Sequence, residues 1–191
     1  MTIELQTPQG LVSSVGVLQI VAEMGSFRLG DKSGNSAYVA GDSIAIELPD
    51  GPVFATLTPR DSGPPMTTIV DGVVKALVPD KSNRPQGIDF YDAIKGLGGW
   101  FGGAKGELAR TDWPALVRFK DLSDRKSAEL VDPDLIGIKR IVVETTSAHA
   151  STGLQKRLKW LNKASWFGDL VEVPRMTDKG TFPVRLNIPP K

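Results

Sequence analysis

The chain has 191 residues, of which 40% are hydrophobic and 24% charged, and its 23 basic and 22 acidic side chains leave a formal net charge of +1. This composition is typical of a soluble globular protein, and its near-zero charge does not select nucleic acid or an anionic membrane as a partner. The absence of cysteine excludes disulfides, thiolate nucleophiles and cysteine-held metals, and the single histidine excludes mechanisms that need two imidazoles.

The first residues, Met1 to Gln6, have neither the basic start nor the apolar run of a signal peptide. No apolar stretch of the sequence approaches the 18 residues that a membrane-spanning helix needs. We therefore expect a cytoplasmic protein that does not contact the membrane.

The charge is divided unevenly along the chain. Residues 1–95 carry seven basic and eleven acidic side chains, whereas residues 96–191 carry sixteen and eleven. The change coincides with residues 96–106, which contain six glycines and cannot hold a regular helix or strand cheaply. The pattern predicts an acidic β-rich lobe with one helix over 1–95, a glycine-rich loop or linker over 96–106, and a basic α+β lobe over 107–191.

In the first half, two short apolar runs flank the turn residues Asp50-Gly51, which predicts a β-hairpin. Further elements are expected from apolar and β-branched runs: strands at Val15–Ala22, Phe27–Leu29 and Thr67–Val78, the last interrupted near Asp71-Gly72, and a helix at Ile88–Leu97.

In the second half, Leu116–Lys120 alternates as a strand, and Ile138–Thr145 breaks its alternation at Lys139-Arg140, which predicts a bulge or a strand covered on both faces. Phe182–Ile188 also alternates, and its proline predicts an edge strand. A helix is expected at about Thr152–Ala164, with Leu154, Leu158 and Leu161 as its buried stripe. The elements together predict an α+β fold of mainly antiparallel strands with two or three helices.

The glycine-rich stretch matches neither the phosphate-binding loop nor the dinucleotide-binding pattern, because the required lysine and third glycine are missing. It carries Trp100 and Phe101, large apolar side chains that make good interface anchors. The alternative is that both residues fasten the loop to the core.

His149 lies in a small polar loop with Ser147 and Ser151, where it could act as a base beside a nucleophile. Loops of this composition are more often caps and turns. Asp121, Asp124, Asp132 and Asp134 fall close together and are candidate ligands for Mg²⁺ or Mn²⁺, the alternative being helix capping and turns.

The second expected helix is basic, and residues 151–166 contain no acid. Its candidate binding residues are Lys156, Arg157, Lys159 and Lys163, with Trp160 beside them. Basic side chains next to aromatic ones can bind an acidic protein surface or a nucleic acid, and the alternative is a solvated face with no partner.

Four segments carry a resemblance: residues 116–127, Val131-Asp-Pro-Asp-Leu135, Ile138–Glu144 and the Thr-Gly-x-x-Lys-Arg-Leu-x-Trp-Leu run over 152–161. In this order they resemble a family of uncharacterised proteobacterial and prophage-associated proteins. Arg125 stands where that family has proline, and a glycine-proline-rich insert after Asp134 is missing. The resemblance implies a bacterial or phage origin and a cytoplasmic setting, and it assigns no catalytic residue.

The scarcity of catalytic side chains favours a non-catalytic binding protein that contacts an acidic partner through the basic helix and the aromatic loop. Two alternatives stay open: a small metal-dependent hydrolase that uses the carboxylates between Asp121 and Asp134, and a structural subunit of a phage or bacterial assembly. No cofactor is expected, and the oligomeric state is left open.

Overall fold

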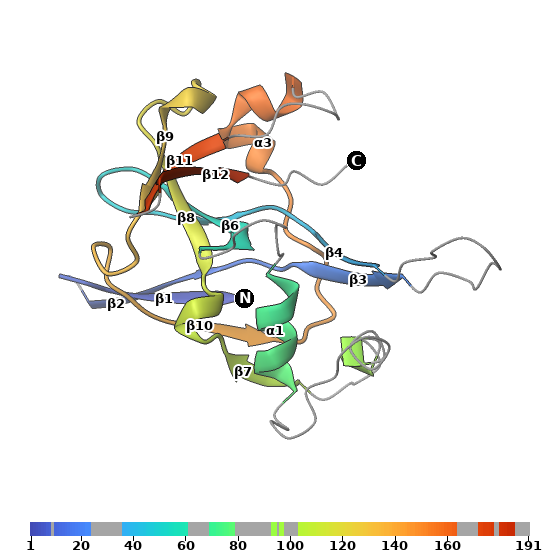
Figure 1. The fold of residues 1–191 in the computed structure, drawn as a ribbon. Coiled ribbons are helices and arrows are strands. Elements are labelled where there is room, and N and C mark those ends of the chain that lie inside the picture. The colour runs from blue at the N-terminus through green and yellow to red at the C-terminus, as the bar shows by residue number, and fades with distance from the viewer. Residues whose placement is uncertain are drawn as a thin grey trace.

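The computed structural model describes residues 1–8, 10–23, 36–60, 69–78, 93–94, 96–97, 103–163, 172–177 and 180–185. Two four-stranded antiparallel sheets make up most of it (Figure 1). Sheet I has the order β2-β1-β10-β7, with β1 (Thr2–Thr7), β2 (Gly10–Val15), β7 (Lys105–Glu107) and β10 (Ile138–Glu144). Sheet II has the order β5-β6-β8-β9, with β5 (Ile44–Ile46), β6 (Val53–Pro59), β8 (Pro114–Phe119) and β9 (Ala128–Val131).

Smaller elements complete the described part of the chain. Two strand pairs stand apart from the sheets, β3 (Gln19–Glu23) with β4 (Ser36–Ala40) and β11 (Glu172–Thr177) with β12 (Gly180–Arg185). The helices whose bounds the structure gives are α1 (Val70–Leu77), α3 (Leu154–Arg157) and the 3₁₀ helices η1 (Arg110–Asp112), η2 (Arg125–Ser127) and η3 (Lys159–Lys163). The predicted α+β class is confirmed, with strands dominating.

Each four-stranded sheet combines strands from both sides of the glycine-rich stretch. β1 pairs with β10 in sheet I, and β6 pairs with β8 in sheet II. Lys105 and Gly106, which the sequence assigns to the loop or linker, lie in β7 and pair with β10. The predicted division into an N-terminal and a C-terminal lobe therefore does not describe how the strands pair.

One apolar core lies between the two sheets and α1. Alternate residues of β1 and β10, such as Ile3 and Ile141, are fully buried in it, as is Val53 of β6. The other face of sheet II packs Phe54, Val117 and Phe119 against Leu158 and Leu161 of the C-terminal helical segment. Sheet II is thus covered on both faces, which explains why β6 and β8 are buried along almost their whole length.

The predictions for the β5–β6 hairpin and for β10 are confirmed. Ile44 pairs with Ala55 and Ile46 with Val53 around the expected turn. In β10 the pairing with β1 shifts register between Ile138 and Arg140, which places an irregularity at the predicted phase break.

The strand predicted over Thr67–Val78 is wrong, because residues 70–77 form helix α1. Val70, Val73, Val74 and Leu77 recur at helical spacing and are all buried. The β-branched residues favour a strand locally. Burial of this one helical face against the core stabilises the helix by more than this local preference. Most of the helix predicted over Ile88–Leu97 lies outside the described residues, and the residues of it that are described, 93–94 and 96–97, are helical.

The second predicted helix is shorter and less regular than expected. α3 ends at Arg157, and η3 begins at Lys159. Side chains three residues apart eclipse one another in a 3₁₀ helix, so this geometry points Leu158 and Leu161 onto the same apolar surface of sheet II. The physical gain is burial of both leucines.

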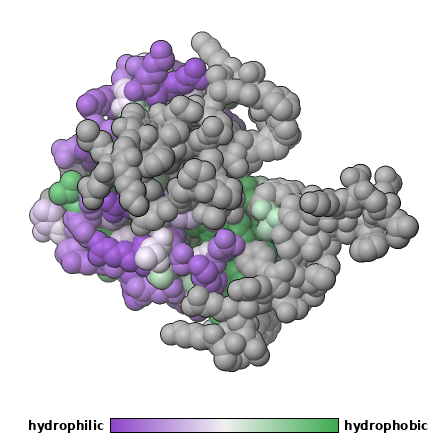
Figure 2. Space-filling model, in the orientation of Figure 1, coloured by the Kyte–Doolittle hydropathy of each residue, from purple (hydrophilic) through white to green (hydrophobic). Residues whose placement is uncertain are grey.

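On the face of the molecule seen in Figure 2, hydrophilic residues gather at the top, over η2 and β9. None of the helices within the described ranges is long and apolar enough to cross a membrane.

Candidate functional site

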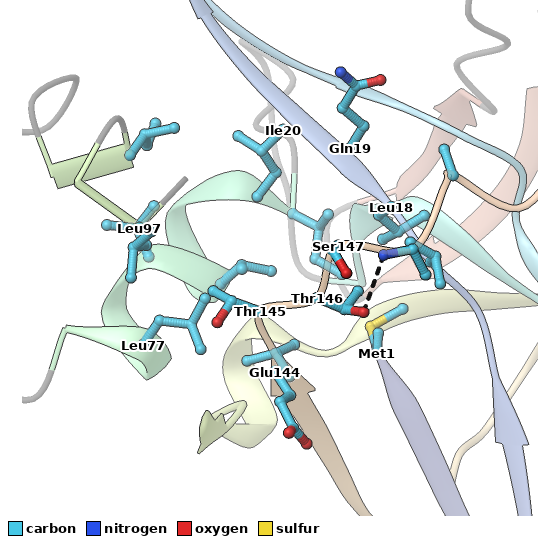
Figure 3. A pocket seen from close by; sticks show the side chains of 18 of the residues that line it. Met1, Leu18, Gln19, Ile20, Leu77, Leu97, Glu144, Thr145, Thr146 and Ser147 are labelled. Atoms are coloured by element: carbon cyan, nitrogen blue, oxygen red, sulfur yellow. Dashed lines mark hydrogen bonds between the residues drawn. The ribbon is translucent and has the colours of Figure 1, made fainter. Parts of the chain in front are cut away.

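A pocket of about 790 Å³ opens between α1, the start of β3 and the segment that follows β10. In Figure 3, Leu77 and Leu97 lie on one side of it and Leu18 and Met1 on the other, with Thr145 between them. Its volume falls within the range of small-molecule sites, about 300–1,000 Å³, and such sites combine apolar walls with a few polar groups.

The polar part of the pocket wall is the segment 145–150, which we call the 145–150 loop. Backbone hydrogen bonds hold it at both ends: the Thr145 N–H donates to the Ala104 carbonyl at 2.9 Å, and the Ser151 N–H donates to the Val17 carbonyl at 2.8 Å. The Ser151 hydroxyl in turn accepts the Val17 N–H at 2.8 Å. The loop is therefore fixed to the connection between β2 and β3.

Thr145 gives the pocket an unsatisfied polar atom. Its Oγ1 is buried and has no hydrogen-bond partner among the described residues. Such atoms are rare in folded proteins, because an unpaired buried hydroxyl costs about 1–3 kcal/mol. Thr145 is also one of the residues that line the pocket.

Two further groups add charge or polarity to the pocket. His149 is exposed and lines it from the loop. The α-amino group of Met1 donates to the Gly16 carbonyl at 2.7 Å, and burial lowers its pKa. Ser151, the predicted neighbour of His149, uses its hydroxyl to hold Val17, and no hydrogen bond joins His149 to Ser147 or Ser151 in the described residues.

The predicted basic helix is exposed on one side. Lys156, Arg157 and Lys159 are all exposed, and Arg157 forms an ion pair with Glu47. Lys156 and Lys159 form no ion pair with any residue that the structure describes. The side chain of Lys163 lies outside the described residues.

Trp160 belongs to the core of this region rather than to its surface. It is half-buried against Phe119, with ring centroids 5.6 Å apart, and its Nε1 is buried without a partner in the described part of the chain. The structure therefore does not place its ring among the exposed lysines. Trp100 and Phe101 lie outside the described residues.

The four candidate metal ligands each have their own partner. Asp121 accepts from the backbone N–H and the hydroxyl of Ser123, and these bonds lower its pKa. Asp124 accepts the Lys126 N–H at the start of η2.

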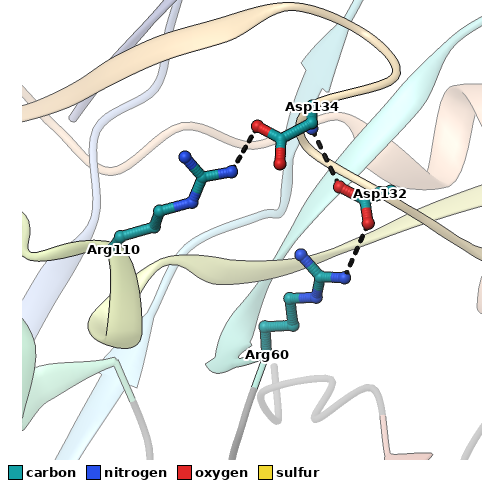
Figure 4. A network of polar contacts seen from close by, with 4 residues as sticks. All are labelled: Arg60, Arg110, Asp132 and Asp134. Atoms are coloured by element: carbon teal, nitrogen blue, oxygen red, sulfur yellow. Dashed lines mark hydrogen bonds and ion pairs between the residues drawn. The ribbon is translucent and has the colours of Figure 1, made fainter.

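The other two aspartates form the network in Figure 4. Asp132 accepts the Asp134 N–H at 2.9 Å and binds Arg60 at 3.1 Å, and both contacts lower its pKa. Asp134 pairs with Arg110. Across the described ranges no three carboxylate or imidazole side chains come together in a way that could hold a metal ion. The capping and turn interpretation fits these four residues.

Of the residues that line the pocket, the sequence analysis names His149 as a possible base and Ser147 beside it, and it does not predict the apolar wall. The apolar wall comes from α1, and a strand was predicted there. The helical spacing of Val70, Val73, Val74 and Leu77 was the signal that could have revealed this wall. Thr145 carried no signal, because only the fold shows that its hydroxyl is buried.

Family models, curated proteins and solved structures were all compared with this chain, and none matches it.

Proposed function

We propose that this protein is a non-catalytic binding protein whose pocket takes a small ligand with an apolar body and one polar group. The observation that carries the proposal is a pocket of about 790 Å³ with an apolar wall on α1, lined also by Thr145, whose Oγ1 bonds to none of the described residues. The ligand's apolar body would lie against Val73, Val74 and Leu77, and its polar group would bond to Thr145 near His149.

The test uses 1-anilinonaphthalene-8-sulfonate, a fluorescent probe with an apolar ring system and one anionic group. We expect saturable binding of one probe per chain. Thr145→Val keeps the shape of the side chain and removes the hydroxyl, so it should weaken binding by about tenfold. The same change should leave the protein as stable as before or slightly more stable, since it removes a buried unpaired group.

Leu18→Trp should fill the pocket and abolish probe binding. Its matched control is Leu48→Trp, which enlarges another partly buried leucine of the core that does not line the pocket. Equal fluorescence from both tryptophan variants, or no saturable binding by the unchanged protein, would contradict the proposal.

A second candidate function is binding of an acidic partner, protein or nucleic acid, at the α3–η3 surface. The observation that favours it is that Lys156 and Lys159 are exposed and form no ion pair with the described residues. The unpartnered charge would steer an anionic partner toward this surface. In this proposal the protein is cytoplasmic and comes from a bacterium or a prophage.

We expect Lys156→Glu/Lys159→Glu to lose retention on heparin and affinity for a single-stranded oligonucleotide without a change in melting temperature. Lys126→Glu/Lys139→Glu makes the same change of charge at two other exposed lysines and serves as the control. If both double variants lose the same heparin retention and oligonucleotide affinity, the effect comes from net charge alone, and the α3–η3 surface is not the binding site.

A further inference from the structure

The outer edge of β2 lacks the features that usually protect a sheet edge. β2 pairs with β1 on one side, and no described strand pairs with its other side. Its sequence, Gly-Leu-Val-Ser-Ser-Val, has no charged residue and no proline, which are the residues that commonly block edge-to-edge association. Leu11, Val12 and Val15 are instead 62%, 43% and 67% exposed.

The hydrogen bonds between β1 and β2 show which backbone groups of β2 are free. The Gly16 N–H donates to the Met1 carbonyl at 3.0 Å, and the Met1 amino group donates to the Gly16 carbonyl at 2.7 Å. Residues of an antiparallel pair alternate between bonded and non-bonded positions, so the even-numbered residues of β2 bond to β1. The N–H and C=O groups of Leu11, Ser13 and Val15 therefore point to the open edge.

The same three residues share the outer face of sheet I. They stand opposite Gln6, Glu4 and Thr2 of β1, whereas the intervening residues Ile3 and Leu5 are fully buried. The free backbone groups and the exposed apolar side chains thus belong to the same residues.

We propose that β2 pairs antiparallel with β2 of a second copy of this chain, with the two Ser13 residues facing each other on the two-fold axis. In this register Leu11 of each copy stands opposite Val15 of the other, and all three residues exchange both backbone hydrogen bonds with their partners. Val12 falls opposite Ser14 on the inner face. A register shifted by two residues would leave Leu11 or Val15 without a partner. The register with Ser13 on the axis therefore pairs all the outward backbone groups and also brings the exposed apolar side chains of Leu11 and Val15 together.

The charges next to β2 allow this contact. In β1, the strand next to β2, the one charged side chain is Glu4, and Arg140 binds its carboxylate through two hydrogen bonds of 2.8 and 3.0 Å. The like charges of the two copies are therefore compensated within each copy. The pairing joins the two sheets into one continuous sheet of eight strands.

The size of the contact sets its strength. One six-residue edge gives an interface at or below the low end of specific ones, about 1,200 Å². We expect a dimer that forms and dissociates with concentration rather than a permanent one. This inference is independent of the proposed pocket ligand.

The test is sedimentation velocity over a concentration series from micromolar to millimolar. The unchanged chain should shift from monomer to dimer. Leu11→Lys/Val15→Lys places lysine opposite lysine twice and should raise the dissociation constant by about tenfold or more. Leu11→Lys/Val15→Glu places lysine opposite glutamate twice and should restore the dimer, because the two substituted residues of one copy are too far apart to pair with each other.

The control is Leu135→Lys/Thr111→Lys, which adds the same charge at exposed positions outside β2 and should dimerise like the unchanged chain. A protein that stays monomeric at every concentration overturns the proposal and leaves this edge to a strand of another protein. A dimer that survives Leu11→Lys/Val15→Lys, or that the lysine–glutamate variant fails to restore, overturns the proposed register and edge.

Discussion

Gly106 lies where the backbone of β7 comes closest to α1. A side-chain carbon at this position would overlap the carbonyl oxygen of Ala76 and would lie 2.6 Å from its carbonyl carbon. Both obstructing atoms are backbone, so no rotamer change relieves the clash.

We therefore expect Gly106→Ala to lower the free energy of unfolding by about 3 kcal/mol or more, as measured by urea denaturation. Gly96→Ala is the matched control, because an added carbon there meets nothing within 4 Å. Equal stability of the two variants would contradict the close approach of α1 and β7.

Asp132 links acid stability to the network with Arg60 and Asp134. The Asp134 N–H, followed by Arg60, lowers the pKa of Asp132, so the folded state favours its ionised form. The contribution is present above the pKa of the unfolded state, about 3.9, and is lost as pH falls through the lower pKa of the folded state.

We expect Asp132→Asn to cost less than about 1 kcal/mol at neutral pH, because Asp132 is 41% exposed and water screens the pair. The cost should shrink as pH falls below the unfolded-state pKa and disappear below the lowered pKa of Asp132 in the folded state, when denaturation is followed across pH. A cost that is the same at pH 2 and pH 7 would show that the carboxylate charge is not its source.

At the scale of the element, α3 obtains its N-terminal cap from a distant part of the chain. Asp42 accepts the Leu154 N–H at 2.7 Å, and the Asp42 N–H donates to the Ser151 carbonyl at 3.0 Å. A four-residue helix is too short to be stable alone, so contacts of this kind hold it in place.

Asp42→Ala should cost about 1 kcal/mol and speed hydrogen exchange at the Leu154 amide, while Asp42→Asn should preserve both because its side chain still accepts a hydrogen bond. Unchanged exchange at Leu154 in the alanine variant would be incompatible with this cap.

The sequence predicts the elements whose signals are local. The Asp50-Gly51 turn predicts the β5–β6 hairpin, and the broken alternation at Lys139-Arg140 predicts the irregularity in β10. α1 escapes prediction because its valines favour strands locally, and only the sheets around it provide the apolar surface that makes it a helix.

The candidate site is harder to predict than the elements. Its wall combines Leu18, Leu77 and Val143, which are far apart in the sequence and adjacent only in the fold. The sequence singles out His149 for the acid–base chemistry of imidazole, and this signal does not indicate a pocket. The burial of Thr145 Oγ1 depends on packing that no local pattern encodes.

At the scale of the whole molecule, both four-stranded sheets require strands from the two halves of the chain. β1 and β10 bury Ile3 and Ile141 together, and β6 and β8 bury Val53 and Leu116 together. Among the described strands, each half by itself completes only a two-stranded pair, β3 with β4 or β11 with β12, and neither completes a four-stranded sheet.

We therefore expect a fragment of residues 1–95 to lack a cooperative thermal transition when followed by far-ultraviolet circular dichroism, whereas the full chain shows one. The same is expected of residues 107–191. A cooperative transition in either fragment alone would contradict the dependence of the sheets on both halves.

Because β1 pairs with β10, sheet I cannot be completed until late in protein synthesis. The first strand leaves the ribosome long before Ile138–Glu144 has been translated, and at 5–20 residues per second the delay is on the order of ten seconds. During this interval the β1–β2 hairpin has an unpaired edge on each side. We expect a chaperone at the ribosome exit to bind such a nascent chain until β10 has been synthesised and can pair with β1.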